Sequence, residues 1–329
     1  MPTAENALLE IESGQSQTSM TALSNSGDNK TFSASASLFS GRAGFDVDVR
    51  PNGIRTGGEI SPASSGTADA VDVAAATAYQ DGADVSIAGT TDLTVNRPST
   101  DPYMKASIVV DGSGSYAVVQ GTEGTGFSDV RGNAGGPPFI PDGQIEVGQI
   151  WYSATASGVV ADDEIYQVVG SHQERYDSPL WEVDYFNGEV SFLSALPKIH
   201  GSSGSEETKN VYASYATPIF SQVQLASDFV PPENSHSVGS TQLYGTTLGS
   251  ISKSLNQGSF TAYLQDGVTD PVIKLRDETL WFRFKPDRHK GAKILAQGKL
   301  GVSRTFPAGD NMSASCTISS QSEANEVEA

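Results

Sequence analysis

The side chains most often used for metal binding are few in this chain and far apart. Its four histidines stand beside loop residues and share no close spacing: His172, His200, His236 and His289. Only His172 has a possible partner, because Glu174 would lie on the same face of a strand. A metal site needs at least one more ligand, which the sequence does not place nearby. We therefore predict no metal site, and an exposed position on a loop or strand for His172.

The acidic residues also lack the pattern of a catalytic or calcium site. Asp162, Asp163 and Glu164 are adjacent in a predicted turn, where their side chains point apart, whereas acid–base catalysis needs two carboxyl groups facing one gap. Asp46 and Asp48 have the spacing of two calcium ligands, but the third ligand, the glycine and the distal glutamate of a calcium loop are missing. We interpret this pair as the solvated face of a strand. Carboxylates from different strands could still meet in space.

Nucleophile and phosphate-binding motifs are missing as well. The chain has no Gly-x-Ser-x-Gly elbow, and Gly121, Gly124 and Gly126 neither match a phosphate-binding spacing nor open a helix. The single cysteine, Cys316, excludes an internal disulfide and a cysteine zinc site. It is in phase with apolar residues of a predicted strand, which indicates a buried core position. We predict no catalytic residue, no cofactor and no metal.

A cluster of basic residues is the most distinctive charged feature. Its members are Lys274, Arg276, Arg283, Lys285, Arg288, Lys290 and Lys293. Strand alternation places Phe282 and Phe284 on the face opposite Arg283 and Lys285, so no aromatic stacking platform lies among the charges. We therefore favour pairing with the acidic surface of a neighbouring subunit over nucleic-acid binding.

Composition favours a two-domain β protein. The chain has 329 residues, 37% of them hydrophobic, with 34 glycines and a net charge of −19, a balance that suits many short strands and turns. Residues 1–225 hold 28 acidic and 10 basic side chains, against 11 and 10 in residues 226–329. Such an acidic surface repels phosphate backbones, although solubility alone would also explain it.

Targeting signals are not evident. The first residues lack the basic and apolar regions of a signal peptide, and no apolar run approaches the roughly 20 residues that span a bilayer. We expect no membrane association, and a protein kept in a reducing cytosol or in a particle assembled there.

Three runs with a period of two mark the last seventy or so residues as strands. Their in-phase apolar residues are Phe260, Ala262 and Leu264, then Leu280, Phe282 and Phe284, then Met312, Ala314, Cys316 and Ile318. Asp270 and Pro271 are a cap and a helix-opening proline, which predict one short helix between the first two strands.

The preceding chain predicts further strands joined by polar segments. Residues 1–30 are expected to form an arm, loosely ordered alone, with a short helix around residues 5–11. Strands in residues 31–60 would complete the domain formed by residues 226–329. Residues 61–67 and 226–240 are predicted linkers. Residues 65–225 would then be an inserted second all-β domain, although two consecutive self-contained domains are the competing layout.

Within residues 65–225, runs at intervals of about ten residues predict an antiparallel sandwich or barrel. Residues 121–143 form a long Gly/Pro-rich segment typical of a binding or assembly loop. Residues 181–193 are the clearest hairpin, with Asn187-Gly188 as a predicted two-residue turn.

The last segment resembles the major tail tube protein of long-tailed bacteriophages. The resemblance rests on the aromatic strand followed by KPDR, the run ILAQGKLGVSRTFPAGDN and the closing strand SASCTISS, about a third of the chain. Residues 31–225 are similar to the extended part of the two-domain tube proteins of flagellum-seeking phages. The resemblance implies a mainly β fold, a tail-tube-type sandwich or barrel that lends strands to a multi-subunit barrel.

The same resemblance implies a structural, non-enzymatic role in the virion tail, after assembly in the bacterial cytoplasm. Hexameric rings would stack head to tail around a lumen through which double-stranded DNA passes without specific binding. Implied partners are the chain itself, a tape measure protein inside the tube, and tail terminator and distal tail or baseplate proteins at its ends. An acidic lining would keep DNA from adhering during ejection.

Two other functions are compatible with the sequence. A tail-tip, fibre or decoration protein would bind a host-surface glycan through residues 121–143 and Trp151 or Trp181, although each tryptophan also fits a buried core. A small β-rich hydrolase would need carboxylates that converge in space.

Overall fold

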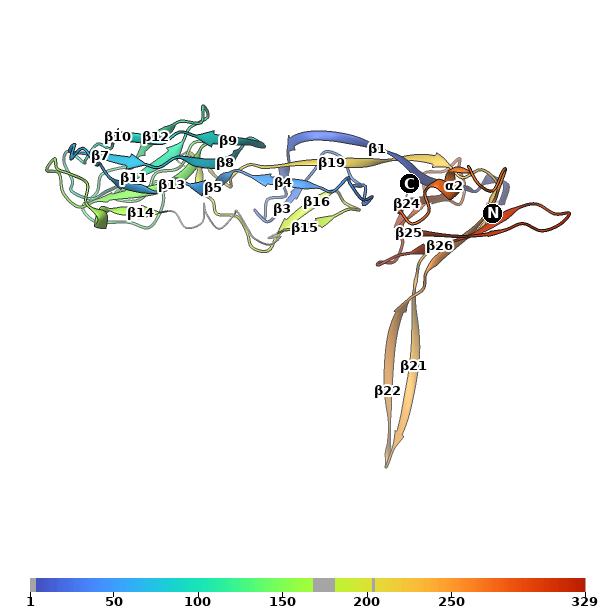
Figure 1. The fold of residues 1–329 in the computed structure, drawn as a ribbon. Coiled ribbons are helices and arrows are strands. Elements are labelled where there is room, and N and C mark those ends of the chain that lie inside the picture. Colours follow the sequence, from blue (N-terminus) through green and yellow to red (C-terminus); the bar gives the residue numbers. More distant parts are fainter. Residues whose placement is uncertain (1–3, 168–180, 203–204, 329) are drawn as a thin grey trace. The chain divides into compact units, whose positions relative to one another are not determined.

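The computed structural model describes residues 4–167, 181–202 and 205–328 of the chain (Figure 1). The predicted fold class is confirmed, because the described chain is mainly β, with several multi-stranded sheets and very little helix. It divides into two compact units. Unit 1 comprises residues 1–18, 38–46 and 215–329, and unit 2 comprises residues 19–37 and 47–214.

The largest sheet has the strand order β20-β23-β26-β25-β24-β1-β19-β4, with β27 paired to β25. Its strands are β1 (Leu8–Ala22), β4 (Asp48–Pro51), β19 (Val211–Gln222), β20 (Ala226–Val230), β23 (Gly258–Tyr263), β24 (Thr279–Lys285), β25 (Lys293–Thr305), β26 (Ser313–Ser319) and β27 (Asn325–Val327). Strands β1 and β19 have residues in both units, and β4 belongs to unit 2. Strand β20 ends the ladder in unit 1, so this sheet is open in the described chain.

The core of unit 1 follows the predicted alternation. The buried members are Phe260, Ala262, Leu264, Leu280, Phe282, Ala314, Cys316 and Ile318. The predicted short helix is α2 (Pro271–Lys274), which buries Val272 and Ile273 against this core. Asp270 precedes the helix as predicted, but its side chain does not cap it. Its carboxylate instead accepts hydrogen bonds from the backbone N–H groups of the preceding residues 265–267.

The N-terminal segment is not the loosely ordered arm that its polar composition suggested. Apart from a 3₁₀ turn at Ala4–Asn6, residues 8–22 form β1, which lies between β24 and β19. Leu9 and Ile11 enter the core of unit 1, and Glu12 is fully buried. The Glu12 carboxylate accepts hydrogen bonds from Ser40 Oγ (2.5 Å) and the Trp281 backbone N–H (3.0 Å). A polar strand is stable here because its buried polar groups are paired.

Residues 38–46 belong to unit 1 but form no strand, so the expectation that the strands of residues 31–60 complete the last domain is wrong. Those strands are β3 (Thr31–Ser33), β4, β5 (Gly53–Gly57) and β6 (Ile60–Pro62), which pair with strands or strand segments of unit 2. Unit 1 instead takes residues 1–18 and 38–46 from the N-terminal region and begins again at residue 215. Unit 2 is therefore inserted in unit 1, with boundaries other than residues 65–225.

Neither predicted linker connects two domains. Residues 61–67 lie inside unit 2 and continue from β6, with Ala63 buried. Residues 226–240 hold β20 and most of β21 (Asn234–Leu243). Serine and proline made both segments resemble linkers, but serine hydroxyls also suit exposed strand positions and proline suits strand edges.

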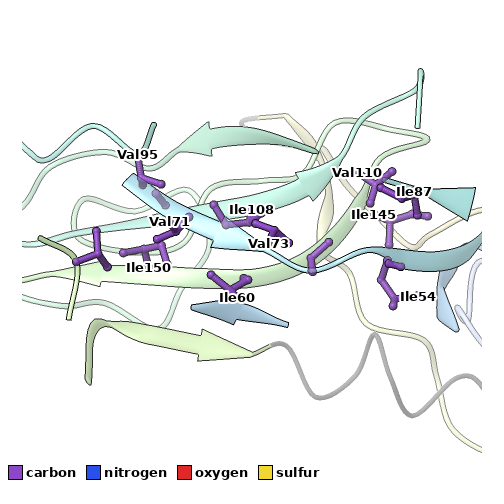
Figure 2. Close-up of a cluster of buried hydrophobic side chains, with 14 of the residues drawn as sticks. Ile54, Ile60, Val71, Val73, Ile87, Val95, Ile108, Val110, Ile145 and Ile150 are labelled. Carbon is purple, nitrogen blue, oxygen red and sulfur yellow. The ribbon is translucent and has the colours of Figure 1, made fainter. Parts of the chain in front are cut away.

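Unit 2 has its own core, built from antiparallel ladders (Figure 2). Three sheets contribute, with the orders β10-β7-β6, β5-β8-β9 and β12-β11-β13-β14. The strands not yet given are β7 (Ala70–Val73), β8 (Ala76–Gln80), β9 (Ala83–Ile87), β10 (Thr90–Thr94), β11 (Met104–Val110), β12 (Tyr116–Gln120), β13 (Ile145–Tyr152) and β14 (Ile165–Gln167). Val71, Ile108 and Ile150 are fully buried where they meet. The antiparallel strands predicted for this region are confirmed.

A further sheet of unit 2, with the order β15-β16-β3-β2, contains the predicted hairpin. Strand β15 (Trp181–Asp184) pairs with β16 (Glu189–Phe192), β16 pairs with β3, and β3 pairs with β2 (Ser24–Asn25). The turn has four residues and not two, because Asp184 is opposite Glu189 in the ladder. The Asp184 carboxylate accepts hydrogen bonds from the backbone N–H groups of Phe186 and Asn187, which fixes the wider turn.

Candidate assembly surfaces

An isolated β-hairpin in unit 1 is exposed along most of its length. Strands β21 (Asn234–Leu243) and β22 (Thr246–Leu255) pair only with each other, in ten consecutive registered pairs (Figure 1). Tyr244 and Gly245 form the two-residue turn, and Gly245 adopts a positive φ of 85° that suits glycine. A single two-stranded hairpin is marginally stable in water, so this one needs cover from elsewhere.

The two faces of the hairpin differ in chemistry. One face carries hydroxyl groups in cross-strand pairs, such as Ser237 with Ser252 at 2.6 Å between their Oγ atoms. The other face sets Val238 opposite Ile251 and His236 opposite Lys253. Val238 and Ile251 are 79% and 76% exposed, and Tyr244 at the tip is fully exposed. The hairpin has no acidic residue, although the whole chain has a charge of −19.

A groove of about 400 Å³ lies in unit 1 beside α2. Its floor is apolar and buried, and includes Ala262, Val272 and Leu275. Its rim is polar and is supplied by Ser13, Ser221, Gln222, Gln224, Gln265 and Asp270. No lysine or arginine lines it. The groove thus combines an apolar floor with hydrogen-bonding groups and negative charge at its mouth.

The sheet edge at β20 is protected against simple strand addition. The ladder between β20 and β23 is interrupted between Ser227 and Val230, and Asp228 in the gap has a positive φ of 56°. A bulge and a charge at an edge discourage pairing with another strand. The hairpin is therefore the better candidate for contact between copies.

The basic cluster forms pairs within unit 1, which corrects part of the prediction that it pairs with a neighbour. Arg283 Nε lies 2.6 Å and Lys285 Nζ 3.5 Å from the Glu10 carboxylate, and Arg283 also lies over the Phe220 ring. Arg288 donates to backbone carbonyl groups of residues 5–7. Composition did not show this, because the acidic partner is some 270 residues away in the sequence.

Those charges explain the titration of Glu10. Burial alone would raise the pKa of its carboxyl group, but the hydrogen bond from Arg283 and the charges of Arg283 and Lys285 together lower that pKa below its usual value. The remaining cations of the cluster are Lys274 and Arg276, which are exposed near α2, Lys293, which is half-buried, and Lys290, which is exposed and 3.8 Å from Asp287. Lys274, Arg276 and Lys293 therefore remain as candidates for pairing with another copy.

The residues considered for catalysis do not converge. Glu164 binds Arg97 through both carboxylate oxygens (2.9 and 3.0 Å), and Arg97 also binds Asp69. Asp162 and Asp163 are exposed, so the three acids have separate environments. In the residues that the structure describes, no group of three or more histidine, cysteine, aspartate or glutamate side chains could hold a metal ion.

The histidines do not meet at a site. His172 and Glu174 lie outside the described residues. His200 is buried, its Nδ1 atom lies 3.4 Å from the Pro141 carbonyl oxygen, and burial lowers the pKa of its imidazole. His236 lies on the hairpin, and His289 lies in the turn after β24.

The aromatic residues considered for glycan binding do gather around Trp151. Lys105 Nζ lies 3.6 Å from the centroid of the indole ring, and the Tyr166 ring stacks on it at 4.1 Å. Strands β11 and β14, which carry these two side chains, flank β13 in the sheet. Phe127, from the Gly/Pro-rich segment, adds a tilted ring contact at 5.5 Å between centroids. Trp151 is half-buried and already packs against Tyr166, Phe127 and Lys105, which leaves less of its ring for a stacked sugar.

Trp181 also has a structural environment. It is half-buried in β15 and packs edge-on against Phe192.

Comparison with known proteins does not assign the chain to a family. No protein-family model matches the chain, and no curated protein matches it significantly. Of the helices in the described residues, none has the length and apolar character that crossing a membrane requires.

Sequence reasoning missed the hairpin at residues 234–255. Two signals were present: runs of β-branched and small polar residues of equal length, and Tyr244-Gly245 between them as a turn. The serines made the first run resemble a linker.

Proposed function

We propose that this protein is the tail tube subunit of a long-tailed bacteriophage and polymerises as stacked hexameric rings that form the conduit for DNA ejection. The observation that carries the proposal is the β21–β22 hairpin, an element whose exposed apolar residues and unpaired strand edges require a partner. The resemblance of residues 257–320 to tail tube proteins adds the class of assembly. The role needs no catalytic residue and no cofactor.

The chemistry of the hairpin favours a repeating assembly. A hairpin on one copy that contacts a different surface on the next copy makes a heterologous contact, which closes into rings or continues as a filament. The partners would be further copies of the chain, a tape measure protein in the lumen and terminator or baseplate proteins at the tube ends. The acidic surface would let double-stranded DNA pass without adhering, and the assembly would reside in the virion tail.

Electron microscopy of the purified chain at rising concentration tests the proposal. We expect rings or hollow tubes from the wild type. A variant in which residues 236–253 are replaced by Asn-Gly keeps the base of the hairpin and a compatible turn. It should fold, because the hairpin contributes nothing to the described core of unit 1, but it should not assemble.

A matched pair of variants separates the apolar face from general damage. Val238→Ser with Ile251→Ser removes the exposed apolar pair, whereas Ser237→Ala with Ser252→Ala alters the opposite face of the same strands. We expect loss of assembly with the first pair and assembly near the wild-type level with the second. Dispersed wild-type monomers at every concentration would refute the proposed function.

A further inference from the structure

The hairpin and the groove beside α2 are complementary surfaces on one chain. The hairpin presents a fully exposed tyrosine, Tyr244, at its tip. Val238, Ile251 and then Lys253 follow along the strands toward its base. The groove presents a buried apolar floor, an acidic side chain at its rim and no lysine or arginine. An unoccupied apolar groove and an uncovered apolar hairpin each expose surface that association would bury.

We infer that this groove binds the hairpin tip of a second copy, with the Tyr244 side chain as its central contact. The inference rests on the proposed function in that it requires copies to meet, and it names the acceptor surface for that contact. Tyrosine suits the groove because its ring can pack on Ala262 and Val272 while its hydroxyl group reaches the polar rim.

The rim offers the hydrogen-bonding groups that a buried tyrosine hydroxyl needs. Ser13 and Ser221 hydroxyl groups lie 2.6 Å apart, and Gln265 Nε2 lies 3.4 Å from Gln224 Oε1 at the mouth of the groove. The second of these bonds is long, so it can be exchanged at little cost for a bond to an incoming hydroxyl group.

Charge gives the contact its direction. Asp270 lines the groove and Asp266 lies four residues before it in the adjoining turn, whereas Lys253 is the one lysine or arginine on the hairpin. The Asp270 carboxylate at the rim attracts Lys253 of the hairpin, although Lys274 and Arg276 are also exposed near α2. Because the two surfaces differ, the contact is heterologous and can propagate from copy to copy.

Disulfide trapping between two populations of full-length chain tests the inference. One population carries Tyr244→Cys and the other carries Gln224→Cys at the groove mouth, and a control population carries Lys290→Cys on an exposed turn. Cys316 is buried and stays in place. After mixing and mild oxidation, we expect the Tyr244–Gln224 cross-link to form at least about tenfold faster than the Tyr244–Lys290 cross-link.

The outcomes separate this inference from the proposed function. Assembly with the expected cross-link supports both. Assembly with a Tyr244–Tyr244 cross-link, or with equal cross-linking rates at Gln224→Cys and Lys290→Cys, overturns binding at the groove but is compatible with the proposed tail tube function. The expected cross-link without rings or tubes supports binding at the groove and overturns the proposed tail tube function. If neither the cross-link nor rings or tubes form, both proposals are overturned.

A second pair of variants measures the same contact without oxidation. Tyr244→Phe retains the ring and should assemble at a concentration within about threefold of the wild type, because one hydroxyl hydrogen bond contributes little. Tyr244→Ser should raise the concentration needed for assembly by about tenfold or more, because it removes the buried ring. Equal behaviour of the two variants would overturn the inference.

Discussion

Cys316 illustrates how burial determines the chemistry of a single residue. Its side chain is fully buried in β26, and desolvation raises the pKa of its thiol to about 12. Because the thiolate is the reactive form, we expect negligible reaction with a thiol-specific reagent in the folded protein and complete reaction in denaturant. Ser315→Cys, one position along on the exposed face of the same strand, is the matched control and should react in the folded state. Rapid labelling of Cys316 in the native wild type would contradict the burial argument.

Lys209 is a buried residue whose titration should affect stability. Burial lowers the pKa of its ammonium group to about 7 in the folded protein, whereas the unfolded-chain value is about 10.4. Between these pH values the unfolded state binds more protons, so the free energy of unfolding should rise with pH. Below about pH 7 this contribution is constant.

Lys209→Met removes that titration. The free energy of unfolding of the wild type minus that of the variant should therefore rise by roughly 1 kcal/mol per pH unit between pH 8 and pH 10. Urea unfolding at several pH values measures it. Lys198 and Lys209 line one cavity, but Lys198 is exposed. The Lys198→Met variant should therefore show no such rise. A constant difference for Lys209→Met would contradict the prediction.

At the scale of elements, the turn between β15 and β16 depends on one glycine. Gly188 has a φ of 67°, and a Cβ atom there would lie 2.4 Å from the Ala36 carbonyl oxygen. Gly188→Ala therefore combines backbone strain with a clash against main chain, and we expect a loss of about 2 kcal/mol or more in the free energy of unfolding. Gly66→Ala is the control, because Gly66 has a similar φ of 76° with open space around it. Equal losses in thermal or urea unfolding would show that strain alone matters.

At the scale of the whole molecule, the two units have separate hydrophobic cores. We expect calorimetry to resolve two unfolding transitions, since each core is large enough to unfold cooperatively. Ile150→Ala in unit 2 and Phe282→Ala in unit 1 should each cost about 2–5 kcal/mol and should each lower the midpoint of a different transition. A single transition lowered equally by both variants would contradict this expectation.

Elements whose signal is local could be predicted from the amino-acid sequence. The alternation around Phe260, Phe282 and Cys316 predicted both the strands and their buried faces, because strand periodicity depends only on neighbouring residues. Asp270 and Pro271 likewise indicated α2.

Which distant segments pair with one another could not be predicted from the sequence, because pairing depends on contacts between residues far apart in the chain. Residues 8–22 are polar enough to suggest an arm, yet Glu10 and Glu12 find partners on β24 some 270 residues later, and those pairings place β1 inside the sheet. The hairpin at 234–255 became visible as an exposed element only once the core of unit 1 was seen to exclude it. Local periodicity determines which face of a strand is apolar, whereas long-range pairing determines whether that face lies in a core, in a groove or in water.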